Sequence, residues 1–274
     1  MEPIRNVNLM SIVFMTVSTV LSFLVPIAII VFMGVKKKLN WKATLLGFLM
    51  FVVFVTILEN IMHVLVLGTD ITKSAIYKNI FLYAIYGGFA AGIFEETARF
   101  LCFRYLLKVH KEEPLNTGLS YGLGHGGFEA ILIGGISSIG NLIMSIMLNK
   151  GLLHSVTSSM SGPQLESYNK GIDALVDTPS FMFLVTGGER MVALVLQIAL
   201  TMFVFIAVRD RKWQYFVFAV LIHAGVDILA VLFQRDVIQN IILLEIIILI
   251  TTVAVSFIAY KITIKKDIGT EEYQ

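Results

Sequence analysis

Long apolar stretches constrain the fold of this chain more than any other feature. Seven of them reach the length of about 20 residues that a helix needs to cross a bilayer. They occupy residues 9–35, 41–67, 77–107, 117–149, 188–208, 213–234 and 238–261. Only 15% of the residues are charged, whereas soluble domains have roughly one-quarter charged residues. Because backbone polar groups in lipid must be satisfied internally, the sequence predicts an all-α, polytopic membrane helix bundle with about seven transmembrane helices.

Lysine and arginine residues gather at alternate ends of these stretches, which predicts the orientation of the chain. Thirteen of the 21 lie at the first, third and fifth connections and at the C-terminal end. They are Lys36, Lys37, Lys38, Lys42, Arg104, Lys108, Lys111, Arg209, Arg211, Lys212, Lys261, Lys265 and Lys266. Cytoplasmic loops carry the excess of Lys and Arg, so we expect the N-terminus outside and the C-terminus in the cytoplasm.

Charge and cysteine content exclude several classes of protein. The formal net charge of +2 is too small to indicate a nucleic-acid partner. The single cysteine, Cys102, excludes an internal disulfide and a cysteine-based metal site. No repeat, low-complexity tract or soluble domain interrupts the apolar pattern, so we expect residues 1–274 to form a single integral membrane domain.

The longest polar segment spans residues 150–187. Its apolar piece, residues 181–185, is too short to span a membrane. Loops longer than about 12–15 residues are commonly functional or disordered, so the sequence predicts a loosely structured external loop here. A lid, or partial re-entry into the membrane, is the alternative.

Three charged residues interrupt the third apolar stretch: Glu95, Glu96 and Arg99. At the centre of a membrane helix each costs roughly 2.5–3.5 kcal/mol on insertion scales. Spacings of three and four residues let both carboxylates reach the guanidinium from one helix face. The residues therefore form either a functional site or a self-satisfied ion cluster that fixes helix packing.

Two other stretches each carry an imidazole and a carboxylate four residues apart. His125 and Glu129 share a face of the fourth stretch, and His223 and Asp227 share a face of the sixth. Counted inward from the cytoplasmic ends at about 1.5 Å per residue, both pairs and the acidic cluster fall in one layer about 12–21 Å deep. This convergence favours a functional site over separate packing residues.

Small residues recur every four positions along two of these stretches. They are Ala84, Gly88 and Gly92 in the third, and Gly118, Gly122, Gly126, Ala130 and Gly134 in the fourth. Such stripes let membrane helices approach closely, which would bring His125 and Glu129 beside the acidic cluster. A further polar group comprises Glu59, Asn60 and His63. Its depth, counted along the helix, puts it near the outer surface, so we expect a second-layer or interfacial cluster rather than a catalytic one.

Two carboxylates and two imidazoles in a buried pocket suit hydrolysis. A carboxylate can take a proton from water while an imidazole stabilises the developing oxyanion. Alternatively, His125 and His223 with a carboxylate could hold zinc with an open position for water. The helical His-Glu-x-x-His zinc signature is absent from the sequence.

Read in order, these residues resemble the motifs of the YhfC family. Those motifs match Glu95-Glu96-x-x-Arg99, Tyr121-x-x-x-His125 with Glu129 one turn on, and His223-x-x-x-Asp227. The family comprises bacterial intramembrane proteases related to the type II CAAX-prenyl endopeptidases and bacteriocin-processing enzymes, to the PrsW proteases and to the APH-1 subunit of gamma-secretase. The resemblance covers most of a core at about residues 77–235.

The resemblance implies an intramembrane protease of the bacterial cell membrane. Its substrate would be a membrane-embedded or lipidated protein or peptide. Glu95 would activate the attacking water, and Glu96 and Arg99 would organise it. The prenyl endopeptidases usually have three residues between the acidic pair and the arginine, whereas this chain has two, so the resemblance leaves open which of the two glutamates activates water.

The resemblance also implies roles for the residues on the other helices. His125 and His223 would stabilise the oxyanion or, with Glu96, bind zinc, and Asp227 would support His223. Zinc-dependent and metal-free chemistry are both compatible with these residues. The same residues are also compatible with two other classes of protein. One is a non-catalytic membrane scaffold or immunity protein. The other is a proton-coupled transporter, because intramembrane Glu and His also serve as proton relays.

Overall fold

The computed structural model describes residues 6–109 and 114–271, and in these residues it contains helices and no strand. The prediction of an all-α fold is therefore confirmed. The helices are α1 (Leu9–Val35), α2 (Trp41–Phe51), η1 (Val52–Glu59), α3 (Asn60–Leu67), η2 (Ile71–Lys73), α4 (Ala75–Lys78), α5 (Ile80–Val109), α6 (Pro114–Glu129), η3 (Ala130–Gly135), α7 (Ile136–Asn149), α8 (His154–Thr157), α9 (Pro163–Asp177), α10 (Ser180–Arg209), α11 (Gln214–Gln234) and α12 (Ile241–Glu271). The basic residue Lys111, which entered the prediction of orientation, lies outside the described residues.

Six helical segments in the described part of the chain are long and apolar enough to cross a membrane. They are Leu9–Val35, Trp41–Leu67, Leu115–Asn149, Ser180–Arg209, Gln214–Gln234 and Ile241–Thr263. The remaining predicted span, residues 77–107, corresponds to α5, which has 30 residues. Its length would suffice, but its charged residues lower its hydropathy.

Two π-helical segments interrupt otherwise continuous helices. The first, η1, lies between α2 and α3 and ends at Glu59, and the second, η3, directly follows Glu129 at the end of α6. A π-helical turn widens the helix and changes which face the following residues occupy, and such turns are frequent at functional sites. The carboxylates of Glu59 and Glu129 therefore lie where the helical register changes.

The chain divides into two compact units. One comprises Met1–Ile29 and Glu129–Met191, and the other Ile30–Phe128 and Val192–Gln274. In the first unit, Val7, Met15 and Leu175 form a small apolar core. In the second, a larger core forms where α5, α6, α10 and α11 contribute Phe103, Tyr121, Leu200, Phe205 and Ala219.

Residues 150–187 are not the loose loop that the sequence predicted, because α8, α9 and the first turns of α10 occupy them. Pro163 at the start of α9 suits a first helical turn, and Ile172 and Leu175 give this helix a buried face. The apolar piece at residues 181–185 belongs to α10, which begins at Ser180, eight residues earlier than expected. The polar composition of this segment explains why the sequence predicted neither the short amphipathic helix α9 nor the early start of α10.

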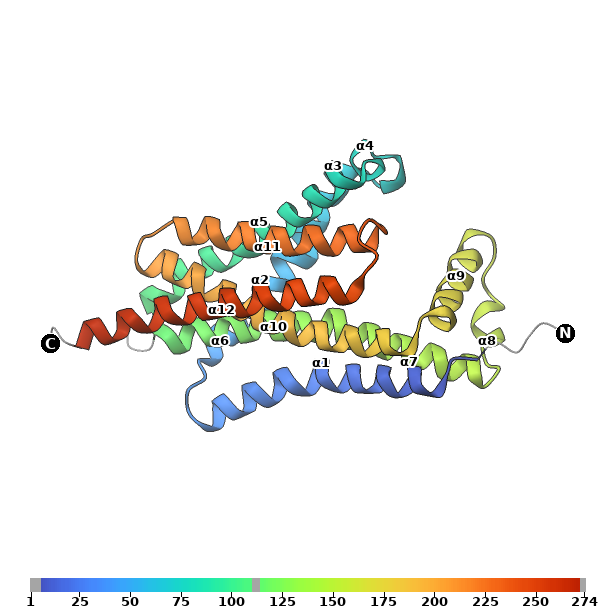
Figure 1. Cartoon of the computed structure of the whole chain (residues 1–274), viewed down its shortest axis with the longest axis horizontal. Helices are drawn as coiled ribbons and strands as arrows, with labels where there is room; N and C mark the ends of the chain where they lie inside the picture. Colours follow the sequence, from blue (N-terminus) through green and yellow to red (C-terminus); the bar gives the residue numbers. More distant parts are fainter. Residues whose placement is uncertain (1–5, 110–113, 272–274) are drawn as a thin grey trace. The chain divides into compact units, whose positions relative to one another are not determined.

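Glycines bring α5 and α11 close together, and the two helices run side by side (Figure 1). A Cβ atom added at Gly88 would lie 2.5 Å from the carbonyl oxygen of Ala224, and one at Gly92 would lie 3.0 Å from that of Val220. The small-residue stripe on α5 therefore packs against α11, which carries His223. The stripe positions the two helices that supply most of the polar cluster described below.

The stripe on α6 faces a different helix from the one expected. A Cβ at Gly118, Gly122 or Gly126 would meet Met202, Thr201 or Gln197 of α10. The opposite side of α6 contacts α2, because a Cβ at Gly124 would meet the carbonyl oxygen of Thr44. Helix α6 is thus held between α2 and α10.

A Gly88→Ala variant should lose stability, whereas Gly87→Ala should not. The added methyl at position 88 would overlap the backbone of α11, and overpacking of this kind costs typically about 1–3 kcal/mol. At position 87 the added methyl would lie 3.7 Å from Val231, an ordinary contact. Thermal unfolding in detergent measures both variants, and equal melting temperatures would contradict this account of the α5–α11 contact.

Candidate active site

An ion cluster on α5 forms the base of the site. Arg99 donates a hydrogen bond to Glu96 Oε1 through Nη1 and, at 3.2 Å, to Glu95 Oε2 through Nη2. Glu96 and Arg99 are fully buried, and Glu95 is 5% exposed. The spacing of three and four residues predicted these ion pairs, and the helix forms them within a single turn.

His223 of α11 approaches both carboxylates from the neighbouring helix. Its Nδ1 lies 2.7 Å from Glu96 Oε1, and its Nε2 lies 3.9 Å from Glu95 Oε1. Asp227, one turn further along α11, places Oδ2 3.4 Å from the same Nε2. Because a carboxylate only accepts, His223 Nδ1–H donates to Glu96, which directs Nε2 toward Glu95 and Asp227.

His125 of α6 contacts Glu95 from the other side. Its Nε2 lies 2.8 Å from Glu95 Oε2, and the residue is fully buried. The imidazole packs edge-on against Phe51 of α2 and stacks over Tyr121, with ring centroids 5.1 and 6.1 Å apart respectively. The two oxygens of Glu95 therefore face the Nε2 atoms of two different histidines.

Gln197 of α10 also belongs to this cluster, and the sequence analysis missed it. Its side-chain oxygen accepts a hydrogen bond from Arg99 Nη2, and its Nε2 donates to Glu95 Oε2 at 3.2 Å. The residue is buried beside Gly126. The available signal was that Gln197 is the only amide side chain in the apolar stretch 188–208.

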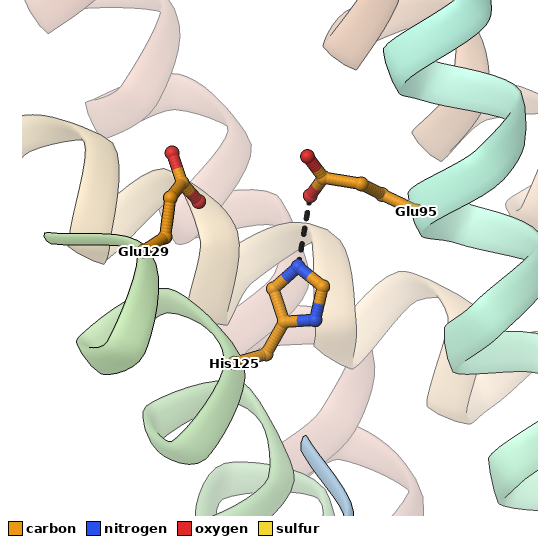
Figure 2. A group of neighbouring side chains, drawn as sticks. All are labelled: Glu95, His125 and Glu129. Atoms are coloured by element: carbon orange, nitrogen blue, oxygen red, sulfur yellow. Dashed lines mark hydrogen bonds and ion pairs between the residues drawn. The ribbon is translucent and has the colours of Figure 1, made fainter. Parts of the chain in front are cut away.

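Glu129 is the last residue of α6, one turn beyond His125, so that helix places both side chains (Figure 2). Its Oε1 lies 3.8 Å from Arg190 Nη1, and Arg190 also donates to Glu189. In the described residues, Glu95, His125 and Glu129 can each offer one ligand atom, and these atoms lie within 4.8 Å of one another.

The donor set of this group fits a divalent metal ion. Imidazole nitrogen and carboxylate oxygen atoms are ligands of zinc and of other first-row metals. The predicted ligands were His125, His223 and Glu96, and only His125 is common to both sets. Glu96 Oε1 accepts from Arg99 and His223, and Glu95 Oε2, which accepts from Arg99 and Gln197, also lies beside His125 Nε2.

Comparisons with known proteins show which family the chain belongs to. A family model described as "YhfC intramembrane metalloprotease" matches residues 21–248. A Bacillus subtilis (strain 168) protein described as "Uncharacterized membrane protein YhfC" is 36% identical over 239 residues, which cover 87% of this chain and 91% of that protein. No solved structure matches the chain. The apolar helices and the similarity to a Bacillus membrane protein together show that the chain is an integral membrane protein of bacteria.

Proposed function

The chain belongs to the YhfC family, described as intramembrane metalloproteases, and from this premise we propose that it hydrolyses peptide bonds within the membrane. Its substrate is a membrane-embedded or lipidated protein or peptide. The observation that carries the proposal is the position of Glu95, a buried carboxylate between the Nε2 atoms of His125 and His223. A cluster that served packing alone would need the Arg99 ion pairs but no converging imidazoles.

Glu95, His125 and Glu129 are the residues that would hold the metal ion, which we propose to be zinc. When bound there, zinc would lower the pKa of its water and polarise the substrate carbonyl. Arg99 and Gln197 orient Glu95 through their hydrogen bonds to Oε2. Such partners of metal ligands fix ligand orientation and typically affect metal affinity by about 10–100-fold.

Glu96 and His223 are assigned to proton transfer. The hydrogen bond from Nδ1–H to Glu96 fixes the tautomer of His223 and leaves Nε2 free to accept a proton. A buried carboxylate plays the same orienting role toward the general base of serine proteases. His223 Nε2 would take the proton of the attacking water, and Asp227, 3.4 Å away, would stabilise the resulting imidazolium.

The topology that we propose has seven crossings, with α5 as the additional one. Its polar face is covered by partners from α10 and α11, which offsets the cost of its charges in lipid. An odd number of crossings agrees with the Lys and Arg distribution, which puts the N-terminus outside and the C-terminus in the cytoplasm. The segment 150–187 is then external. We also infer from the motif order a relationship to the type II CAAX-prenyl endopeptidases.

Elemental analysis of detergent-purified protein tests the metal assignment. We expect about one equivalent of divalent metal in the wild type, as for a site with three protein ligands, and loss of that metal in His125→Ala. His63→Ala is the matched control, because His63 lies on α3 and contacts none of the proposed ligands in the described structure. Folded wild-type protein that takes up no added zinc would contradict the assignment.

A further inference from the structure

A second charged cluster surrounds Arg190 of α10, and the proposed mechanism uses only Glu129 of it. Arg190 Nη1 lies 3.8 Å from Glu129 Oε1, and Nη2 donates to Glu189 Oε1. A Cβ atom added at Gly134 would lie 2.5 Å from Arg190 Cγ and 3.0 Å from Cδ, so the stem of Arg190 crosses η3 at a residue without a side chain. We call Glu129, Glu189 and Arg190 the Arg190 cluster.

Serine residues of α1 show how deep this cluster lies. Ser11 Oγ lies 2.8 Å from Ser180 Oγ, at the start of α10. The Cβ atom added at Gly134, which would meet Arg190, would also lie 2.7 Å from Ser22 Oγ. Ser22 follows Ser11 by 11 residues and Arg190 follows Ser180 by 10, so Ser22 and Arg190 lie at the same level.

That level lies well inside the bilayer. Ser22 is the central residue of α1, an apolar helix of 27 residues that contains no charged side chain. At about 1.5 Å per residue, roughly 20 Å of helix extends on either side of it, more than half the thickness of a hydrocarbon core of about 30 Å. The same level puts the first turns of α10 inside the membrane, so the external segment ends near Ser180 and not at residue 187.

The side chains of the Arg190 cluster are nevertheless partly exposed. The exposed fraction is 30% for Glu189, 14% for Arg190 and 11% for Glu129. Charged side chains at such a depth face the bundle interior or water rather than lipid. Ser22 Oγ is buried with no hydrogen-bond partner in the described part of the chain, which is unfavourable for a hydroxyl group. Water beside the cluster would solvate the charges and supply the missing hydrogen bond.

Thr186 extends the polar face of α10 from the Arg190 cluster toward Ser180. It is exposed and lies one turn before Arg190, so both residues occupy the same side of the helix. Leu184 is also exposed, but it lies about 140° around the helix from Glu189. The same turns of α10 therefore present an apolar side that suits lipid and a polar side that does not.

We propose that water enters the membrane along this polar face, from the Ser180 end of α10 past Thr186 to the Arg190 cluster, and reaches the candidate active site at Glu129. Glu129 ends α6 one turn beyond His125 and is a proposed metal ligand, so hydrolysis would consume water there. The use of this water in hydrolysis rests on the proposed function. The access of water to the polar face does not.

Cysteine labelling tests whether water reaches this face. Thr186→Cys, Glu189→Cys and Leu184→Cys, each in a Cys102→Ala background, are treated with a membrane-impermeant methanethiosulfonate reagent. The reactive species is the thiolate, which needs water to form, so the first two variants should react at least about tenfold faster than the third. Position 184 is nearer the helix end, so depth alone would give the opposite order. Thr186→Cys keeps all three charges of the cluster and decides the result if Glu189→Cys does not fold.

Lys170→Cys shows from which side the reagent must be added. Lys170 is exposed on α9, which directly precedes the Ser180 end of α10. Intact cells or inverted vesicles are used, whichever allow Lys170→Cys to react, and labelling after unfolding in detergent gives the total thiol of each variant. The proposal is overturned if folded Thr186→Cys reacts no faster than Leu184→Cys, or reacts only from the opposite side.

The labelled Thr186→Cys protein tests whether the site uses this water. A bulky adduct at position 186 would obstruct the path, so new protein N-termini that depend on the wild type should be lost after labelling and retained before it. Metal content should stay unchanged, because Thr186 is not a proposed ligand. Complete labelling that left these N-termini in place would overturn the route. Their absence from membranes that contain the wild type would instead contradict the proposed function, and the labelling rates would still decide whether water reaches the face.

Discussion

Replacing Arg99 with methionine should lower the free energy of unfolding by about 3–5 kcal/mol, the largest stability effect expected in this chain. Methionine fills a similar volume, but it leaves Glu95 and Glu96 buried without the guanidinium group of Arg99. Removing one partner of a buried ion pair destabilises the fold by more than the intact pair stabilises it, because the remaining charge stays desolvated. Denaturant or thermal unfolding in detergent measures the loss.

The neighbouring arginine provides the control for that experiment. Arg104 lies on the same helix but is exposed, so Arg104→Met should change stability by less than about 0.5 kcal/mol. The double variant Arg99→Met, Glu96→Gln should recover part of the loss, because one of the two stranded charges is removed. If Arg99→Met proved as stable as Arg104→Met, the ion cluster would not contribute to the fold as described.

Glu95→Gln should abolish peptide hydrolysis, with a loss of at least about a thousandfold, while the protein still folds. An amide keeps the shape of Glu95 but supplies a weaker metal ligand and cannot pair with both His125 and His223 as a carboxylate does. The measurement compares new protein N-termini in membranes from cells that make wild-type or variant protein. Cleavage products specific to the wild type should disappear in the variant.

Glu166→Gln repeats the same chemical change on an exposed surface and should leave the cleavage products unchanged. The melting temperature of Glu95→Gln should stay close to that of the wild type, because Arg99 keeps its bond to Glu96. Cleavage products that persisted in folded Glu95→Gln would remove this residue from the chemistry. A variant that lost only stability would instead favour a scaffold.

The sequence predicted the parts of the site that depend on the geometry of a single helix. The spacing of Glu95, Glu96 and Arg99 determines their ion pairs wherever α5 lies. Depth along each helix also placed His125 and His223 near the acidic pair. Which imidazole contacts which carboxylate depends on how the helices are rotated against one another, and helical periodicity carries no such information.

The parts that the sequence missed depend on contacts between distant segments. In the sequence Gln197 is an isolated amide. Only the packing of α10 against α6 brings its side chain to Arg99. The helix α9 was missed because its few apolar residues, Ile172 and Leu175 among them, contact partners that a local pattern does not reveal.

The polar face of α5 has a consequence for the order in which the chain is made. Glu96 obtains its imidazole partner from a residue synthesised 127 positions later, and Arg99 obtains Gln197 98 positions later. A ribosome-bound chain that ends after α6 therefore presents the buried charges of α5 to the translocon before His223 and Gln197 have been synthesised. We expect such chains to hold α5 at the lateral gate and to be degraded if released, so that this helix settles into the bilayer only when α11 emerges.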